Sequence, residues 1–244
     1  RDGQQRGGMI LLVGDGTRAD VRHAIAQVEP LAREVASTVL VDLDQSIDVE
    51  KQHPNLVINF GGDGSLLRAV RRLGVHQVPV LGVNFGKFGF LAEYELPELL
   101  LRLEDAVNGR LPTRQSLMLK VTVRHGKRHE DVIVLNDIVL LRAPEERMPT
   151  LHVSAGGAEV ASYYGDGLIV STPLGSTAYN LSAGGPLLHP NLDALVMTPI
   201  CPHTLSIRPL VLPAFGPMLI ELHDGDSITA TMDGQGTLNL KHGD

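Results

Sequence analysis

The stretch that decides the fold reads LVINFGGDGSLLRAVRRL and covers residues 56–73. It opens with an apolar, β-branched run and continues into a glycine-rich turn, Gly61-Gly62-Asp63-Gly64. Apolar residues then recur at the three- and four-residue spacing of one helix face. We therefore predict a buried strand over 56–60, a tight turn, and a helix from Leu66 to Leu73.

The sequence on either side of this stretch repeats the alternation of strand and helix. Short β-branched runs separated by helical segments are typical of a parallel sheet with crossover helices. The last helical segment is followed by Asn108-Gly109, a natural stop. We expect strands over 9–13, 38–43, 56–60 and 78–84, and helices over 19–37, 66–73 and 96–107.

The sequence pattern changes after Leu111-Pro112, where helix-length amphipathic segments give way to short strands separated by turns. This change predicts a second, β-rich and sandwich-like domain. Runs of strand character there cover 117–125, 130–141, 150–155, 159–164 and 167–173. The fold class expected is an α/β N-terminal domain with a parallel Rossmann-like sheet, plus a C-terminal all-β sandwich-like domain.

Composition limits the classes of protein to which the chain can belong. Its 244 residues are 43% hydrophobic and 20% charged, as in ordinary globular proteins. The only cysteine, Cys201, excludes an intramolecular disulfide and is expected to be a small buried hydrophobe. The net charge of -7 argues against nucleic acid, and no apolar stretch approaches the roughly 20 residues of a membrane span. We expect a cytoplasmic protein whose partners include neither nucleic acid nor membrane.

The turn Gly61-Gly62-Asp63-Gly64 lies where a strand meets a helix, at the carboxyl edge of a parallel sheet. Backbone amides and a helix N-terminus favour phosphate at such a position. Phosphates repel a carboxylate, so Asp63 is a candidate to accept a proton from an attacking hydroxyl or to hold a phosphate-bound Mg²⁺. The structural alternative for Asp63 is a helix N-cap or Asx turn. The turn is neither a Walker A loop nor the G-x-G-x-x-G fingerprint.

A second glycine-rich loop, residues 82–90, follows the next expected strand. Two such loops after neighbouring strands would enclose one crevice. Phe90 either stacks on a base there or belongs to the core.

A third, longer segment, residues 165–186, is dense in glycine and small hydroxyl residues. These residues allow close backbone approach and supply uncharged hydrogen-bond partners, which suits ribose and amide groups. The alternative is a Ser/Gly-rich loop with ST-turns. Neither Ser171 nor Ser176 lies in a G-x-S-x-G elbow, and the ten histidines include no zinc-binding spacing, so no metal ligands are predicted.

These motifs, in this order, resemble those of NAD kinases over about residues 56–236. The resemblance implies an α/β domain, a β-sandwich, a nucleotide site between them, and assembly as a homodimer or homotetramer. It also implies ATP with Mg²⁺ as phosphoryl donor and NAD as acceptor. The matching motifs are Gly61-Gly62-Asp63-Gly64, Asn136-Asp137, residues 165–185, Pro199-Ile200-Cys201-Pro202-His203 with Arg208-Pro209, and Asp233-Gly234-Gln235.

The resemblance also implies roles for single residues. Asp63 corresponds to the catalytic aspartate, proposed as the base for the adenosine 2'-hydroxyl. Asp137 departs from the family pattern, because it stands where Glu is usual. Some of the NAD contacts are expected to come from a neighbouring subunit. The residues expected to bind nucleotide are Gly61, Gly62, Gly64, Phe90, Asn136, Asp137, Asp166, Thr177, Ala178, Tyr179 and Ser182.

With these roles, the chain divides into three segments. An α/β nucleotide-binding domain is expected over 9–113 and a β-rich NAD-binding domain over 114–232. The last segment, 233–244, is expected to return to the first domain. Two other functions stay open: a lipid kinase, which also carries a GGDG loop, and a non-enzymatic NAD-binding sensor that has lost the chemistry.

Overall fold

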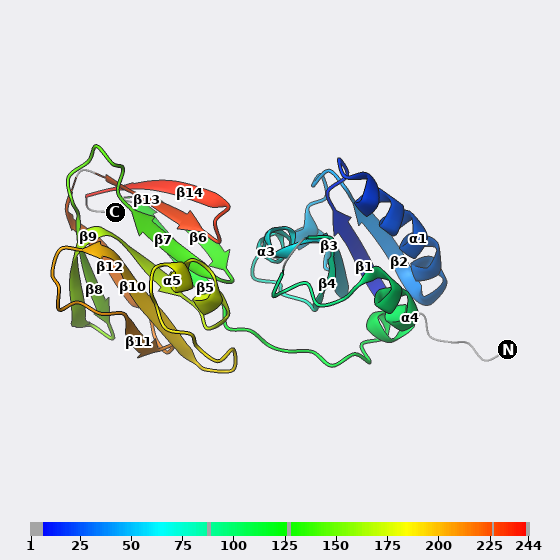
Figure 1. Cartoon of the computed structure of the whole chain (residues 1–244). Helices are drawn as coiled ribbons and strands as arrows, with labels where there is room; N and C mark the ends of the chain where they lie inside the picture. The colour runs from blue at the N-terminus through cyan, green and yellow to red at the C-terminus, as the bar shows by residue number, and fades with distance from the viewer. Residues whose placement is uncertain (1–6, 87–88, 126–127, 226, 243–244) are drawn as a thin grey trace. The chain divides into compact units, whose positions relative to one another are not determined.

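The computed structural model describes residues 7–86, 89–125, 128–225 and 227–242 (Figure 1). The chain divides into two compact units, Arg1–Arg114 and Gln115–Asp244. Each unit buries its own clusters of apolar side chains. Among the described residues, no helix has the length and apolar character needed to cross a membrane.

The first unit is a parallel sheet covered by helices on both faces, as the sequence predicts. The elements are β1 (Gly7–Gly14), α1 (Ala19–Val35), β2 (Ala36–Asp42), α2 (Val49–Gln52), β3 (Leu56–Gly61), α3 (Asp63–Arg72), β4 (Val80–Asn84) and α4 (Leu96–Val107). Alternate residues of β1 point to opposite faces: Ile10 and Leu12 pack with α1 and α4, while Leu11 and Val13 pack with α3.

The strand order β2-β1-β3-β4 places a topological switch point between β1 and β3. β1 pairs with β2 on one side and with β3 on the other, all in parallel. Open parallel sheets bind ligands at the carboxyl ends of the strands beside such a point. The loops after β1 and β3 both begin at this edge of the sheet. The loop after β3 contains Gly61-Gly62-Asp63.

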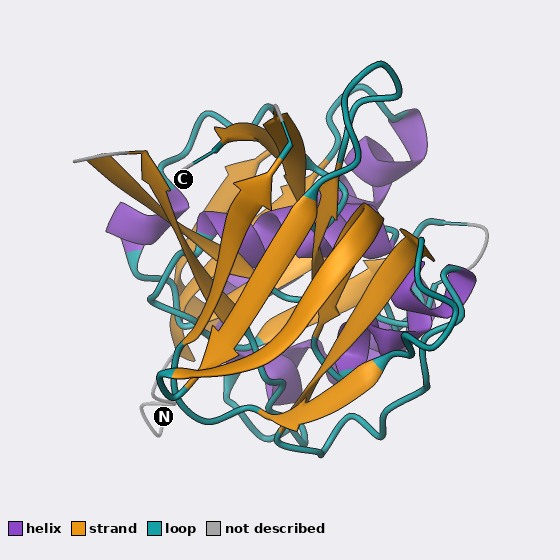
Figure 2. Cartoon of the chain, turned by 90° about the vertical axis from the view of Figure 1, so that its left-hand side faces the viewer, coloured by secondary structure: helices purple, strands orange, loops and turns teal. Residues whose placement is uncertain are grey.

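The second unit is built on an antiparallel sheet, which confirms the predicted β-rich fold (Figure 2). Its main path runs β11-β10-β9-β7-β13-β14, and β8 and β12 join it through the first half of β9. The strands are β5 (Leu119–His125), β6 (Arg128–Val134), β7 (Asp137–Leu141), β8 (Thr150–Ala155), β9 (Ala158–Ser171), β10 (Ala194–Pro202), β11 (Leu210–Pro213), β12 (Met218–Asp224), β13 (Ser227–Met232) and β14 (Gly236–Lys241). Two short helices, η1 (Leu174–Thr177) and α5 (Tyr179–Ser182), follow β9.

Several boundaries differ from the sequence prediction. The first strand starts at Gly7 instead of residue 9, and α1 ends at Val35 because Ala36 already pairs with Gly7 in the sheet. The run 130–141 is two strands in different sheets, β6 and β7. Conversely, 159–164 and 167–173 were expected as separate strands, but β9 runs through Gly165 without a break. A Cβ on Gly165 would lie 2.9 Å from the Pro202 Cα, so glycine is needed there for close strand pairing and not for a turn.

Residues 236–241 form β14 and pair with β13 at the edge of the second unit's sheet. One further expectation is wrong. Cys201 is exposed, not buried, and adopts a positive φ of 44° near the end of β10.

Candidate functional site

Asp63 is the first residue of α3, and its carboxylate is held by the backbone of the next glycine-rich loop. Oδ2 accepts a hydrogen bond from the Phe90 amide at 2.8 Å, and Oδ1 accepts from Leu91 at 3.0 Å and Ala92 at 3.3 Å. The position before it, Gly62, is the N-cap, so Asp63 does not cap its own helix. A carboxylate oxygen has two lone pairs. Counting donors from the described residues, the three amides leave one acceptor direction on Oδ2 for a hydroxyl.

Glycine makes this arrangement possible at two positions. A Cβ on Gly61 would lie 2.6 Å from the Ser65 Cβ, and one on Gly89 would lie 2.7 Å from Asp63 Oδ1. The first contact brings β3 close to α3, and the second lets the loop approach the carboxylate. Any larger side chain at Gly89 would push the loop away from Asp63.

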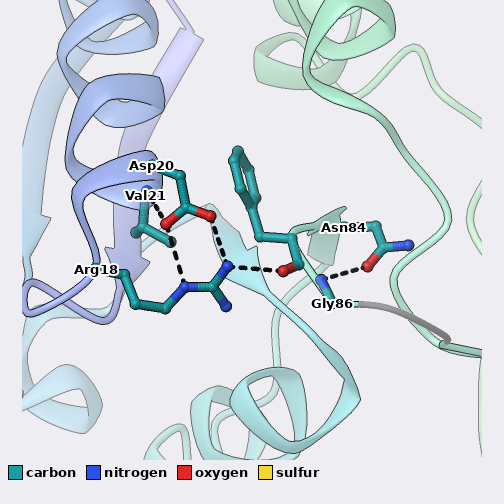
Figure 3. A network of polar contacts seen from close by, with 6 residues as sticks. Arg18, Asp20, Val21, Asn84 and Gly86 are labelled. Atoms are coloured by element: carbon teal, nitrogen blue, oxygen red, sulfur yellow. Dashed lines mark hydrogen bonds and ion pairs between the residues drawn. The ribbon is translucent and has the colours of Figure 1, made fainter.

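The second glycine-rich loop is also tied to the loop after β1 (Figure 3). The Arg18 guanidinium donates from Nη2 to the Phe85 carbonyl oxygen at 2.8 Å and is paired with Asp20 at 2.6 Å. Asn84 Oδ1 accepts from the Gly86 amide at 2.8 Å. Arg18 and Asp63 thus fix the two ends of the loop. Lys87 and Phe88, which belong to the predicted motif, lie outside the described residues.

Phe90 is 78% exposed, so the alternative of a core residue is wrong. Its backbone is fixed by Asp63, while its ring projects toward solvent. An exposed aromatic ring on a residue whose amide binds the carboxylate is available to stack on a base or sugar.

In the second unit, Asn136 and Asp137 lie at the connection between β6 and β7. The Thr172 amide donates to the Asn136 carbonyl at 2.9 Å, and the Thr172 hydroxyl donates to the Leu135 carbonyl at 2.6 Å. Asn136 Oδ1 is buried and, within the described parts of the chain, has no hydrogen-bond partner. A buried acceptor left without a donor is costly. It therefore marks a position where a ligand donor would be stabilised.

The Asp137 side chain is almost fully buried, with 4% of the residue exposed. Burial, and secondly the negative charge of Asp233, raise the pKa of Asp137 to about 6. A hydrogen bond from the Tyr179 backbone acts in the opposite direction and lowers this pKa. Loss of water around a charged carboxylate disfavours the ionised form. Asp137 therefore changes charge close to the physiological range.

This raised pKa gives a pH-dependence that can be tested. The folded chain holds the Asp137 proton more tightly than the unfolded chain, so the contribution to stability is present below pH 4 and is lost as the pH rises through about 6. The loss reaches at most roughly 3 kcal/mol at neutral pH. We expect Asp137→Asn to unfold at higher urea concentration than the parent chain at pH 7.5, with little difference at pH 4.5. An equal difference between the two chains at both pH values would contradict the assignment.

The segment after β9, which contains η1 and α5, carries both buried and exposed polar residues. Asn180 is fully buried: its Nδ2 donates to the carbonyls of Ser176 and Pro186 at 3.0 Å each, and its Oδ1 accepts from Thr198 at 2.6 Å. Ser176, also fully buried, donates to the Pro173 carbonyl at 2.6 Å. The sequence analysis assigns no role to Asn180 and does not predict these buried hydrogen bonds. The polar residues of this segment, which lie between apolar strands, were the signal that could have indicated them. The residues proposed for NAD, namely Thr177, Tyr179 and Ser182, are exposed, and Ala178 is half-buried.

Asp166 is separated from this group. Its Oδ1 accepts from Arg142 Nε at 2.8 Å, at the end of β7 opposite to Asp137. Asp137 lies opposite Ser171 in β9, five residues beyond Asp166, which corresponds to about 16 Å along the strand. The second unit thus gathers Asn136, Asp137 and Tyr179, but it does not bring Asp166 to them.

Comparisons with known proteins identify the family of both units. Residues 32–111 match the model of the ATP-NAD kinase N-terminal domain, and residues 135–244 match that of the C-terminal domain. The NAD kinase of Geotalea daltonii is 41% identical over 220 residues, which are 89% of this chain and 76% of that protein. The NAD kinase of Moorella thermoacetica is 44% identical over 189 residues, 77% of this chain and 61% of that protein.

Two solved structures share the fold. The yeast NADH kinase complexed with NADH is similar with a TM-score of 0.78 at 24% identity, covering 98% of this chain and 77% of the yeast chain. An NAD kinase from Archaeoglobus fulgidus in complex with ATP is similar with a TM-score of 0.71 at 27% identity, covering 96% of this chain and 87% of the other. With both domain models matched in order over most of its length, the chain belongs to the NAD kinase family.

Proposed function

We propose that the chain transfers the terminal phosphate of ATP to the 2'-hydroxyl of the adenosine ribose of NAD, giving NADP. The observation that carries this proposal is the Asp63 carboxylate, which three backbone amides orient while, among the described residues, no donor takes the remaining acceptor direction. Membership of the NAD kinase family favours this function over a lipid kinase. One similar structure is a complex with NADH and the other a complex with ATP, which supports a nicotinamide dinucleotide and ATP as the ligands.

In this mechanism Asp63 acts on the acceptor hydroxyl. An aliphatic hydroxyl is a poor nucleophile near neutral pH, and a carboxylate within hydrogen-bond reach takes its proton as the bond to the terminal phosphorus forms and ADP leaves with the bridging oxygen. Such general-base assistance contributes about 10²–10⁴-fold. The rest of the protein's contribution is alignment, which the anchored loops and the exposed Phe90 ring supply.

Mg²⁺ is proposed to enter with ATP. Mg²⁺ commonly binds through substrate phosphates with only one or two carboxylates from the protein. When bound, the ion neutralises charge on the transferring phosphoryl group.

NAD recognition is proposed to use the Asn136 amide oxygen together with exposed Thr177, Tyr179 and Ser182. Gly61, Gly62 and Gly64 are proposed to line the nucleotide beside Asp63, and Asp166 to contact the NAD of a neighbouring subunit. A homodimer or homotetramer is therefore part of the proposal, and light scattering coupled to gel filtration tests it. The single, unbridged cysteine supports a cytoplasmic site of action.

We expect Asn136→Ala and Tyr179→Ala to weaken NAD binding by about 5- to 10-fold each, because each removes a neutral contact. Isothermal titration calorimetry with NAD measures the dissociation constants. Thr122→Ala on β5, whose hydroxyl donates to Asp131, is the matched control and should bind NAD normally. An unchanged dissociation constant in both site variants would count against the proposed NAD site.

One assay separates the candidate functions. The purified chain is incubated with ATP, Mg²⁺ and NAD, and NADP is measured with a dehydrogenase specific for it. NADP formation supports the kinase. Phosphorylation of diacylglycerol vesicles without NADP would select a lipid kinase, and NAD binding without product would select a sensor.

A further inference from the structure

Asp233 is a buried acid in an unfavourable backbone conformation. It directly follows β13, is 6% exposed, and has a positive φ of 50°. A non-glycine residue pays about 1–2 kcal/mol for left-handed geometry, although Asp tolerates it better than most. A buried charge is costly as well unless it is hydrogen-bonded. The fold retains both features at one position, so the carboxylate must be compensated there.

The compensation comes from one short segment, residues 135–137. Asp233 Oδ2 accepts from the Leu135 amide at 3.0 Å, and Oδ1 accepts from Asn136 at 2.7 Å and Asp137 at 3.3 Å. In return, the Asp233 amide donates to the Asp137 carbonyl at 2.9 Å. One side chain thus binds every backbone amide of the connection between β6 and β7.

The opposite side of the same segment is fixed by the start of the glycine-rich block. Thr172 donates to the carbonyls of Leu135 and Asn136. Gly175 packs closely against Asn136: a Cβ added to Gly175 would lie 2.1 Å from the Asn136 carbonyl oxygen. The segment is therefore held from both sides, and its conformation is set by Asp233 as much as by Thr172.

The side chains carried by this segment are those proposed to bind NAD. The Asn136 amide oxygen is buried without a partner in the described part of the chain, so its direction is determined by the backbone that carries it. The Asp137 side chain is buried next to Asp233. A change of about 1 Å at such a position is enough to misalign a bound ligand.

We propose that Asp233 is a positioning residue for NAD: by binding the amides of Leu135, Asn136 and Asp137, it holds the Asn136 amide oxygen where it accepts a hydrogen bond from the dinucleotide. This inference rests on the proposed function. Asp233 does not touch the reacting atoms and acts only through residues 135–137. The charge of Asp233 also contributes to the raised pKa of Asp137, which shows that the two carboxyl groups influence each other.

Asp233→Asn tests the inference, because asparagine also tolerates a positive φ and has nearly the same shape. Its NH₂ group cannot accept from the Leu135 amide. We expect the KM for NAD to rise at least about tenfold, the cost of losing a hydrogen bond to a charged group. The KM for ATP should change less than twofold. Asp131→Asn is the matched control, since Asp131 is an exposed aspartate on β6 that contacts Lys120 and Thr122.

A double-mutant cycle distinguishes positioning from a general loss of structure. If Asp233 acts through Asn136, the two substitutions are not independent. The double variant Asp233→Asn/Asn136→Ala should then raise the dissociation constant for NAD by less than the product of the two single fold-changes. Additive effects would overturn the inference. If Asp233→Asn fails to fold, Asp233→Ser, which keeps one acceptor oxygen, replaces it in the same cycle.

The outcomes separate this inference from the proposed function. A normal KM for NAD in Asp233→Asn, with weakened binding in Asn136→Ala, would overturn the positioning role and leave the NAD site standing. Normal NAD binding in both variants would overturn the NAD site itself. An equal rise in the KM values for NAD and ATP would also overturn the positioning role.

Discussion

Asp63→Asn should lower kcat by about 10²–10⁴-fold, which is the contribution of a general base in reactions of this kind. Asparagine keeps the size of the side chain, and its Oδ1 can still accept from Leu91 and Ala92. The asparagine side chain cannot take a proton from a hydroxyl. Its NH₂ group would face the Phe90 amide, which in the parent chain donates to Asp63 Oδ2. The loss should therefore appear mainly in turnover.

Initial rates of NADP formation at saturating ATP and NAD measure this effect. Calorimetry with NAD should show a dissociation constant within a few-fold of the parent value. Asp105→Asn is the matched control, because Asp105 lies on α4 and pairs with Arg110. A kcat for Asp63→Asn within threefold of the parent would remove Asp63 from the role of base.

Gly175→Ala should weaken NAD binding at least tenfold and destabilise the second unit. The new Cβ would lie 2.1 Å from the Asn136 carbonyl oxygen, far inside van der Waals contact, and this oxygen is a backbone atom that no side-chain rotation can move away. Either η1 or residues 135–137 must move. Such overpacking costs about 1–3 kcal/mol, and the displaced segment carries the proposed NAD ligands Asn136 and Asp137.

Calorimetric melting and NAD titration measure the two effects of this substitution. Gly156→Ala is the matched control: it adds the same methyl group in the second unit, has no atom within 4 Å of the new Cβ, and pays only for its positive φ of 59°. The control should lose some stability but no NAD affinity. If Gly175→Ala bound NAD as tightly as the control, the close packing against Asn136 would be irrelevant to binding.

The sequence predicts the first unit well because its signals are local. The helix from 96 to 107 is found with its observed bounds, since its apolar spacing and the Asn108-Gly109 stop are contiguous in the chain. The strand-turn-helix around Asp63 is found for the same reason. Long β9 is divided wrongly, because glycine in a strand and glycine in a turn look alike until the pairing partner is known.

The candidate site is less accessible to sequence reasoning, because its contacts join distant residues. Asp63 binds amides 27 to 29 positions away, and Asp233 binds amides 96 to 98 positions away. Motif matching marks Asp63, Asn136 and Asp233 but gives no partner for any of them. The alternative of an N-cap for Asp63 follows from local rules, whereas the structure directs its carboxylate to a loop that local rules do not include.

The position of the transferred phosphate tests the central claim most directly. Phosphorus NMR on the product of ATP, Mg²⁺, NAD and the purified chain reports which hydroxyl has been phosphorylated. We expect one new phosphomonoester signal, on the 2'-oxygen of the adenosine ribose, growing in step with ADP and growing at least about 10²-fold more slowly with Asp63→Asn. A phosphate on any other hydroxyl, or ADP formed with no phosphorylated dinucleotide, would contradict it.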